Sequence, residues 1–189
     1  LVLNKKVFGT NIFRALFFMP HMTNISTVSI IWIAMLNPYG PISEVLGKII
    51  GGDNVPNFLS NPNTALPSLI FIGIWIEMGY FMMFFLAGLQ NIPKELYEAS
   101  TVDGANWWQK FRNVTIPMLS PTTFFILITS LIFSFKVFGQ VNIMTEGGPA
   151  RSTSVLVYYI YETGFKFYNM GYASAMAWVL FLIIFLITY

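Results

Sequence analysis

PKELYEASTVDGANWWQKFRNVTIP, residues 93–117, is the stretch on which the interpretation of the whole chain depends. It separates two long apolar runs, and a connector between such runs is usually a short turn. Pro93 suits a first helical position, where its missing N–H costs no hydrogen bond. Glu95 and Glu98 follow in the early turns, where the helix dipole favours negative charge. The connector is therefore predicted to begin with a short helix.

The second half of the connector carries a turn and a further helical segment. Gly104 permits a left-handed backbone turn that other residues adopt at a cost. Residues 105–114 are predicted to form a second short helix, and Pro117 is predicted to end it before the next apolar run. This connector is therefore expected to be a folded helix–turn–helix element.

Composition places the chain among membrane proteins. Of its 189 residues, 56% are hydrophobic and only 10% are charged, whereas soluble domains carry about 25% charged residues. There is no cysteine, which excludes disulfides and thiolate sites, and the single histidine, His21, argues against a histidine-based metal site. The net charge of +2 comes without a basic patch, so nothing indicates nucleic acid. Gly47-Lys48 lacks the rest of a phosphate loop, so no ATP site is visible in this chain.

The apolar pattern predicts an all-α fold, a polytopic bundle of transmembrane helices forming a single membrane domain over residues 1–189. Crossing about 30 Å of hydrocarbon takes roughly 20 residues, and the predicted spans lie near 14–36, 65–90, 119–141 and 169–189, with the connecting loop at 91–118. The chain begins with Leu1 and stops inside an apolar run, so we expect it to be a fragment.

The distribution of Lys and Arg predicts the orientation of these spans, because cytoplasmic loops carry the excess of both. One side holds Lys5, Lys6, Arg14, Lys94, Lys110 and Arg112, and the other holds Lys48, Arg151 and Lys166. The first side is therefore predicted to be cytoplasmic, and loop 91–118 is on that side.

Polar residues inside the spans are the candidates for a solute pathway, because they are costly against lipid. His21 follows the kink expected at Pro20 in the first span. Gly73, Glu77 and Tyr80 share one face of the second span. Glu77 is interpreted either as a cavity wall that binds hydroxyl groups or as a structural partner of Lys136; Ser130 and Ser134 share a face of the third span.

The connector resembles the "EAA" signature of ABC-importer permease subunits. Glu98-Ala99-Ser100, three residues, Gly104, nine residues and Val114-Thr115-Ile116-Pro117 reproduce its spacing, with conservative departures at Ser100, Val114 and Ile116. In that family the loop is a cytoplasmic coupling helix that docks on the ATPase subunit. The resemblance therefore implies that the ATPase-coupling residues are Glu98, Ala99, Ser100, Asp103, Gly104, Ile116 and Pro117.

Further segments resemble the carbohydrate-uptake branch of the same family, and its first permease in particular. They include Leu86-Ala87-Gly88-Leu89-Gln90, Phe135-Lys136-Val137-Phe138 and Thr145-Glu146-Gly147-Gly148-Pro149. With Glu77 added from its place on the polar face, the implied substrate pathway comprises His21, Gly73, Ile76, Glu77, Tyr80, Ser130, Ser134 and Val137.

The resemblance also implies a mechanism and a set of partners. The mechanism is alternating access in a bacterial inner membrane. The partners are a second permease subunit, a dimeric cytoplasmic ATPase that binds the ATP and Mg, and an extracytoplasmic solute-binding protein. This chain itself would hold no cofactor and would not be an enzyme.

Three alternatives stay open at this point. A permease of the same family could carry glycerol phosphate or an amino acid rather than a sugar. A secondary transporter could couple to protons through Glu77, although that would leave the elaborate loop unexplained. An intramembrane enzyme has the least support, because no Ser/His/Asp, metal-ligand or paired-carboxylate pattern is visible.

Overall fold

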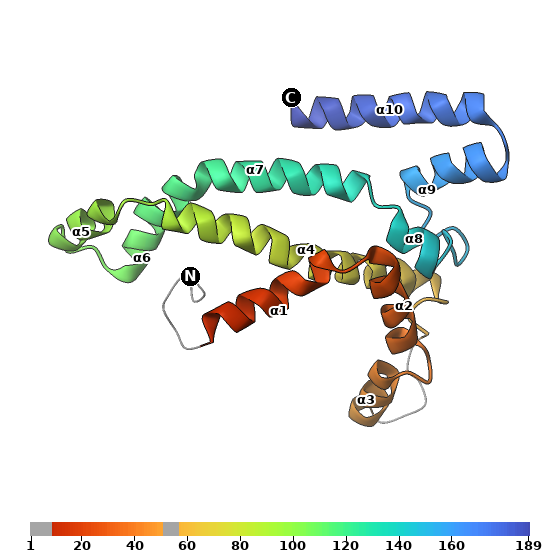
Figure 1. Ribbon diagram of the computed structural model, residues 1–189, viewed down its shortest axis with the longest axis horizontal. Coiled ribbons are helices and arrows are strands. Elements are labelled where there is room, and N and C mark those ends of the chain that lie inside the picture. The colour runs from red at the N-terminus through yellow and green to blue at the C-terminus, as the bar shows by residue number, and fades with distance from the viewer. Residues whose placement is uncertain (1–8, 51–56) are drawn as a thin grey trace. The chain divides into compact units, whose positions relative to one another are not determined.

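The computed structural model describes residues 9–50 and 57–189, and every regular element in those ranges is a helix (Figure 1). The α-helices are α1 (Thr10–Met22), α2 (Ile25–Leu36), α3 (Pro41–Ile50), α4 (Pro62–Gln90), α5 (Lys94–Val102), α6 (Trp107–Lys110), α7 (Ile116–Phe135), α8 (Gly139–Met144), α9 (Leu156–Tyr161) and α10 (Met170–Thr188). Two π-helical turns, η2 (Phe111–Thr115) and η3 (Glu162–Lys166), complete them.

By length and apolar composition, the described residues contain 4 segments that could cross a membrane. They are Ile25–Ile49, Pro62–Gln90, Trp107–Met144 and Met170–Thr188. The predicted all-α class with about four spans is therefore confirmed. Lys5 and Lys6, which contributed to the predicted orientation, lie outside the described residues.

The first predicted span, 14–36, is two helices rather than one kinked helix. Pro20 lies in the last turn of α1, and α1 ends at Met22. The side chain of Asn24 then accepts a hydrogen bond from the backbone N–H of Ser26 and starts α2. A proline that removes a helix hydrogen bond, followed closely by a capping asparagine, accounts for the break. With 13 residues, α1 is about 20 Å long and too short to cross the hydrocarbon alone.

The prediction that Pro117 ends a helix is wrong. The chain passes from α6 through the π-helical turn η2 into α7 without leaving a helical conformation, and Pro117 lies in the first turn of α7. The wide turn that precedes it changes the hydrogen-bond register, so that the backbone N–H of Ile116 bonds to the carbonyl of Phe111. A π-turn of this kind is one of the ways in which a helix accommodates a local disturbance.

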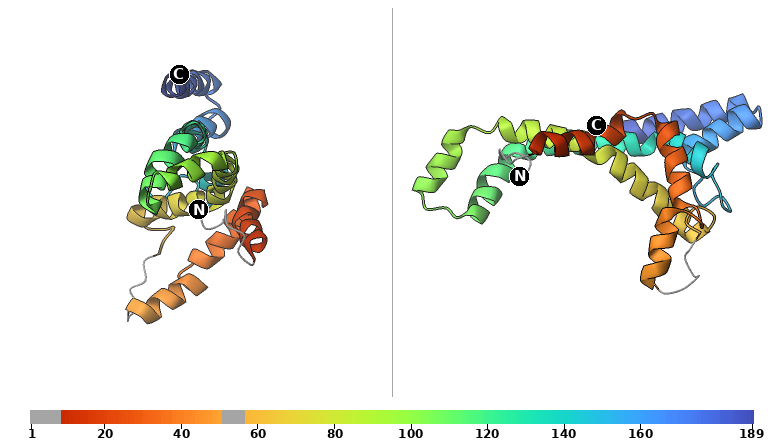
Figure 2. Two further views of the ribbon diagram at one scale, coloured as in Figure 1. Left: turned by 90° about the vertical axis from the view of Figure 1, so that its left-hand side faces the viewer. Right: turned by 60° about the horizontal axis from the view of Figure 1, so that its bottom comes forward.

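The described residues form two compact units. The first contains the residues up to Met22 together with Ile76–Ser130, and the second contains those of Thr23–Trp75 together with Leu131–Tyr189. In the first unit α1 crosses α4 at Gly79, where a Cβ atom would overlap the backbone of Phe17. The second half of α4 also packs against α7, and α5 and α6 follow together at the end of this pair (Figure 2).

In the second unit, small residues and aromatic rings join the helices. Gly139 of α8 lies against Ile25 of α2, where an added Cβ would be 3.2 Å from the Ile25 side chain. Trp32 of α2 meets Trp75 of α4 edge to face, with ring centroids 5.4 Å apart. In contrast, only 6% of the apolar window of α10 is buried within the chain. The apolar surface of α10 is therefore left for lipid or for protein outside the described residues to cover.

Candidate functional site: the α5–α6 loop and a polar cluster on α1 and α4

The turn between α5 and α6 is built around Gly104. Pro93 is the residue before α5, one position earlier than predicted, and α5 ends at Val102. Gly104 adopts φ +74°, as its type predicted, and the backbone N–H of Ala105 bonds to the carbonyl of Ser100 over 2.9 Å. Apart from its two chain neighbours, no described residue has an atom within 4 Å of the place where a Cβ of residue 104 would be. Gly104 is thus required by the backbone conformation and leaves open space beside it.

The start of α6 is fixed by a reciprocal pair of hydrogen bonds. The backbone N–H of Gln109 donates to Oδ1 of Asn106 over 2.9 Å, and the backbone N–H of Asn106 donates to Oε1 of Gln109 over 2.8 Å. This is a capping box, which satisfies two N–H groups that a helix start would otherwise leave unpaired. The spacing Asn-x-x-Gln is a local signal for this helix start, and it is present in the sequence in addition to the signals at Pro93 and Gly104.

Side chains also tie the two halves of the loop together. The hydroxyl groups of Tyr97 and Thr115 are 2.9 Å apart, and Thr115 is buried. Nζ of Lys110 donates to the hydroxyl of Thr101 over 2.8 Å. These bonds connect α5 with the α6–η2 segment, so that the angle between them is held by more than the turn alone.

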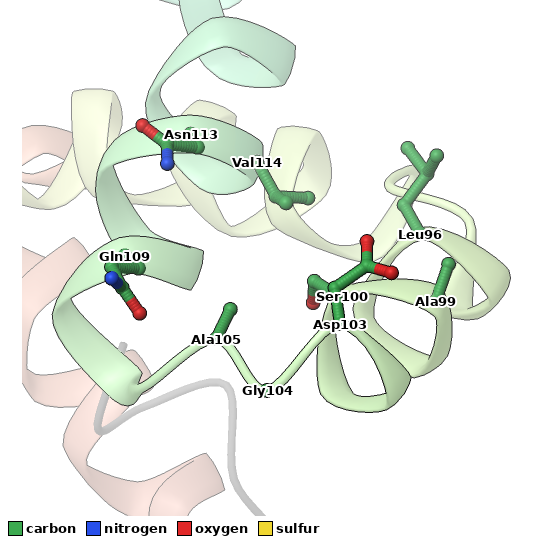
Figure 3. A pocket seen from close by; sticks show the side chains of 9 residues that line it. All are labelled: Leu96, Ala99, Ser100, Asp103, Gly104, Ala105, Gln109, Asn113 and Val114. Carbon is green, nitrogen blue, oxygen red and sulfur yellow. The ribbon is translucent and has the colours of Figure 1, made fainter.

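A hollow of about 460 Å³ lies between the two halves of the loop (Figure 3). The Asp103 carboxylate stands on one side, and the amides of Gln109 and Asn113 stand on the other. The complete lining is Leu96, Ala99, Ser100, Asp103, Gly104, Ala105, Gln109, Asn113 and Val114. The lining combines apolar and small side chains with two amides, a hydroxyl and one carboxylate, so it offers both apolar contact and hydrogen bonds to a side chain of another protein.

Four of the predicted coupling residues line this hollow, namely Ala99, Ser100, Asp103 and Gly104. The structure places the other three, Glu98, Ile116 and Pro117, outside the lining and at the surface. The predicted coupling residues did not include the five further lining residues, Leu96, Ala105, Gln109, Asn113 and Val114.

A second cluster joins α1 to α4 within the first unit. The rings of His21 and Tyr80 are stacked, with centroids 4.5 Å apart and planes inclined by 20°. Nδ1 of His21 lies 3.5 Å from Oε2 of Glu77, which is too long for a good hydrogen bond. Both atoms are buried and neither has a hydrogen-bond partner. Because buried polar atoms are normally paired, this cluster is suited to take up a hydroxyl group that donates to the carboxylate and accepts from the ring.

Within the first unit, the polar neighbour of the Glu77 carboxylate is the His21 ring, which lies on a different helix. This neighbour of Glu77 was not indicated by the sequence, and the alternative pairing with Lys136 stays a prediction because Glu77 and Lys136 belong to different units. His21 and Glu77 are adjacent in space, although they lie in different predicted spans and nothing in their spacing connects them.

The other predicted pathway residues are divided between the two units. Ile76 and Ser130 belong to the first, where Ile76 is buried and the Ser130 hydroxyl donates to the carbonyl of Leu127. Gly73, Ser134 and Val137 belong to the second. There a Cβ at Gly73 would lie 3.6 Å from Oε1 of Gln140, a buried residue for which no sequence signal exists.

Comparison with known proteins identifies one family and several similar permeases. The family described as "Binding-protein-dependent transport system inner membrane component" matches residues 3–189. The probable ABC transporter permease protein YesP of Bacillus subtilis is 40% identical over 191 residues, which cover 100% of this chain and 61% of YesP. The sn-glycerol-3-phosphate transport system permease protein UgpA of Agrobacterium fabrum is 33% identical over 187 residues, covering 98% of this chain and 63% of UgpA.

A solved structure is similar over nearly the whole chain. It is the crystal structure of a bacterial alginate ABC transporter in complex with alginate pentasaccharide-bound periplasmic protein. The TM-score is 0.87 and the sequence identity is 27%, with 99% of this chain and 66% of that chain covered. The chain thus spans less than two thirds of the length of these relatives.

Proposed function

From the premise that this chain belongs to the family of binding-protein-dependent transport inner-membrane components, we propose that it is the permease subunit of an ATP-driven importer for a sugar or oligosaccharide. It is a multi-pass membrane protein of this family. In the proposal it lies in a bacterial inner membrane, with loop 91–118 on the cytoplasmic side. It carries no catalytic residue of its own, and a partner ATPase binds ATP and Mg.

The observation that carries the proposal is the folded α5–Gly104–α6 loop between two candidate membrane spans. The loop is braced by a capping box and by the Tyr97–Thr115 bond, and it encloses the hollow lined by Asp103 and its neighbours. A rigid element of this kind transmits a movement of a docked partner to the helices that continue from it. In this proposal the ATPase dimer docks on the loop, and α4 and α7 carry the movement into the membrane.

The cluster of His21, Glu77 and Tyr80 supports a polar, hydroxyl-bearing solute. The stacked rings of His21 and Tyr80 provide a flat surface, and the unpaired Nδ1 and Oε2 atoms are free to bond a hydroxyl group. Sugars present both hydroxyl groups and apolar ring faces, which suit these two features. A transporter similar in structure is described as importing an acidic polysaccharide, alginate, which also favours a carbohydrate.

Two alternatives to a sugar importer are an importer for an anionic solute and a proton-coupled transporter. UgpA is named as a glycerol-3-phosphate permease, so an anionic solute is the alternative within the family. Proton-coupled transport through Glu77 and His21 would not require the braced loop.

The experiment is purification of the full-length protein from membranes of its own organism, with identification of the proteins that remain bound. We expect an ATPase, a second permease subunit and a solute-binding protein, and the binding protein can then be screened against neutral and anionic sugars. A variant with Gly104→Asp serves as the matched control, because it should reach the membrane but lose the ATPase. Transport by the chain alone, without an ATPase, would contradict the proposal.

A further inference from the structure

The turn that follows α8 has an unusual backbone. Glu146, Ala150 and Arg151 adopt φ values of +48°, +48° and +60°, in the left-handed region that glycine favours. Residues with a side chain rarely adopt this conformation, and they keep it only where the surrounding structure imposes it. Such positions concentrate at functional sites, so this turn calls for a functional explanation.

Buried groups beneath the turn impose its shape. The Thr153 side chain is almost completely buried, and its hydroxyl donates to the carbonyl of Gly148 over 2.7 Å. The same hydroxyl lies 2.7 Å from that of Thr145, so the two ends of the turn are joined. Gly147 packs directly on the ring of the buried Tyr158, where a Cβ atom would come within 2.7 Å. The turn is therefore a rigid element rather than a loose connection.

This rigid turn presents two opposite charges to its surroundings. Glu146 and Arg151 are both exposed, at its beginning and its end. The guanidinium of Arg151 stands 5.9 Å from the centre of the Tyr159 ring, which supports the side chain. Neither residue contributes to the buried network of Thr145, Thr153 and Gly148. The rigid backbone thus fixes the points from which these two side chains extend to the surface.

The position of the turn in the sequence determines which side of the membrane it faces. The candidate span Trp107–Met144 begins in the α5–α6 loop region and ends where the turn starts. The two segments therefore flank one membrane crossing and face opposite sides. If the α5–α6 loop is cytoplasmic, as the proposed function requires, the turn faces the side from which a solute is delivered.

We propose that the turn 145–151 is a rigid docking point for the extracytoplasmic solute-binding protein, which offers an acidic group to Arg151 and a basic group to Glu146. This inference rests on the proposed function. A lipid headgroup layer presents mobile charges and gains nothing from two opposite charges in a fixed geometry. A folded protein surface does gain from them, because complementary charges at fixed positions speed association and select the partner.

The test uses the full transporter complex in lipid vesicles, with ATP hydrolysis measured against the concentration of solute-loaded binding protein. For Arg151→Glu we expect the concentration that gives half-maximal stimulation to rise about tenfold or more, because a like charge then faces the acidic group. Glu146→Lys should act in the same direction, and the shift should shrink at high salt.

The matched control is Lys48→Glu, which makes the same charge change at an exposed residue predicted to lie on the same membrane side. It should leave the half-maximal concentration unchanged. If Arg151→Glu fails to assemble, Arg151→Gln and Glu146→Gln carry the test with smaller shifts. An unchanged half-maximal concentration in the Arg151 and Glu146 variants, or an equal shift in Lys48→Glu, would overturn the inference. Absence of stimulation in the wild-type complex would instead overturn the proposed function.

Discussion

Replacing Gly104 separates its backbone role from its proposed role in docking. Gly104 has φ +74°, and among the described residues none beyond its two chain neighbours comes within 4 Å of an added Cβ. Within the chain, Gly104→Ala therefore meets no steric obstacle, and its cost is limited to the left-handed backbone, about 1–2 kcal/mol. That cost lowers the population of the native loop conformation by a factor of about 5–30 at most. The affinity for the ATPase should fall by no more than this factor.

Larger side chains at residue 104 test whether the partner approaches the loop closely. Asparagine tolerates the left-handed conformation better than alanine does, so Gly104→Asn has the smaller backbone cost. If the ATPase packs against Gly104, the Asn and Asp side chains occupy space that the bound ATPase would otherwise fill. We then expect both variants to lose more than about 100-fold in affinity, which exceeds the limit set by the backbone.

The measurements are the affinity of the ATPase for the full-length permease complex and ATP-dependent uptake in vesicles. The control is Gly171→Ala in α10, because no described residue outside its own stretch of helix lies within 4 Å of its added Cβ and its φ is not left-handed. Gly171→Ala should leave both the affinity for the ATPase and the ATP-dependent uptake unchanged. ATPase binding by Gly104→Asp within about 5–30-fold of wild type would refute the docking of a partner at this turn.

Three further predictions concern other parts of the chain. Glu77→Gln should retain ATP-dependent uptake, because an amide still offers an acceptor to a hydroxyl group; uptake that falls sharply and no longer changes with pH would instead favour proton coupling. Gly79→Ala should destabilise the protein by about 1–3 kcal/mol, because the added Cβ overlaps the backbone of Phe17; an unchanged melting temperature would show that α1 does not cross α4 there. Thr153→Val removes the bonds to Thr145 and Gly148 and should cost about 1–3 kcal/mol of stability; a melting curve identical to that of the wild type would contradict the rigidity of the turn.

Much of the α5–α6 loop could be predicted from local sequence. A helix start near Pro93, a left-handed residue at Gly104 and a second helical segment before residue 117 all depend on residues close together in the chain, and all three are present. Pro117 does not end a helix as predicted, because the effect of a proline depends on the hydrogen-bond register of the preceding turn. That register is π-helical at 111–115, and neither residue propensity nor apolar spacing indicates it.

The polar cluster on α1 and α4, in contrast to the loop, could not be predicted from local sequence. Local periodicity placed Gly73, Glu77 and Tyr80 on one face of a helix, and it identified His21 as a costly residue in another. It did not indicate that His21 would stack on Tyr80 and lie beside Glu77, because this depends on how α1 crosses α4 at Gly79. Nor did the order of the residues indicate that Gln140 would lie beside Gly73.

The sequence by itself therefore determined that this is an all-α membrane protein and where its folded loop lies, because hydrophobic runs, prolines and glycines act over a few residues. Only the tertiary structure decided the partners of His21 and Glu77 and the lining of the hollow between α5 and α6. Those contacts join segments that are distant in the chain, and side-chain packing at the helix crossings selects them.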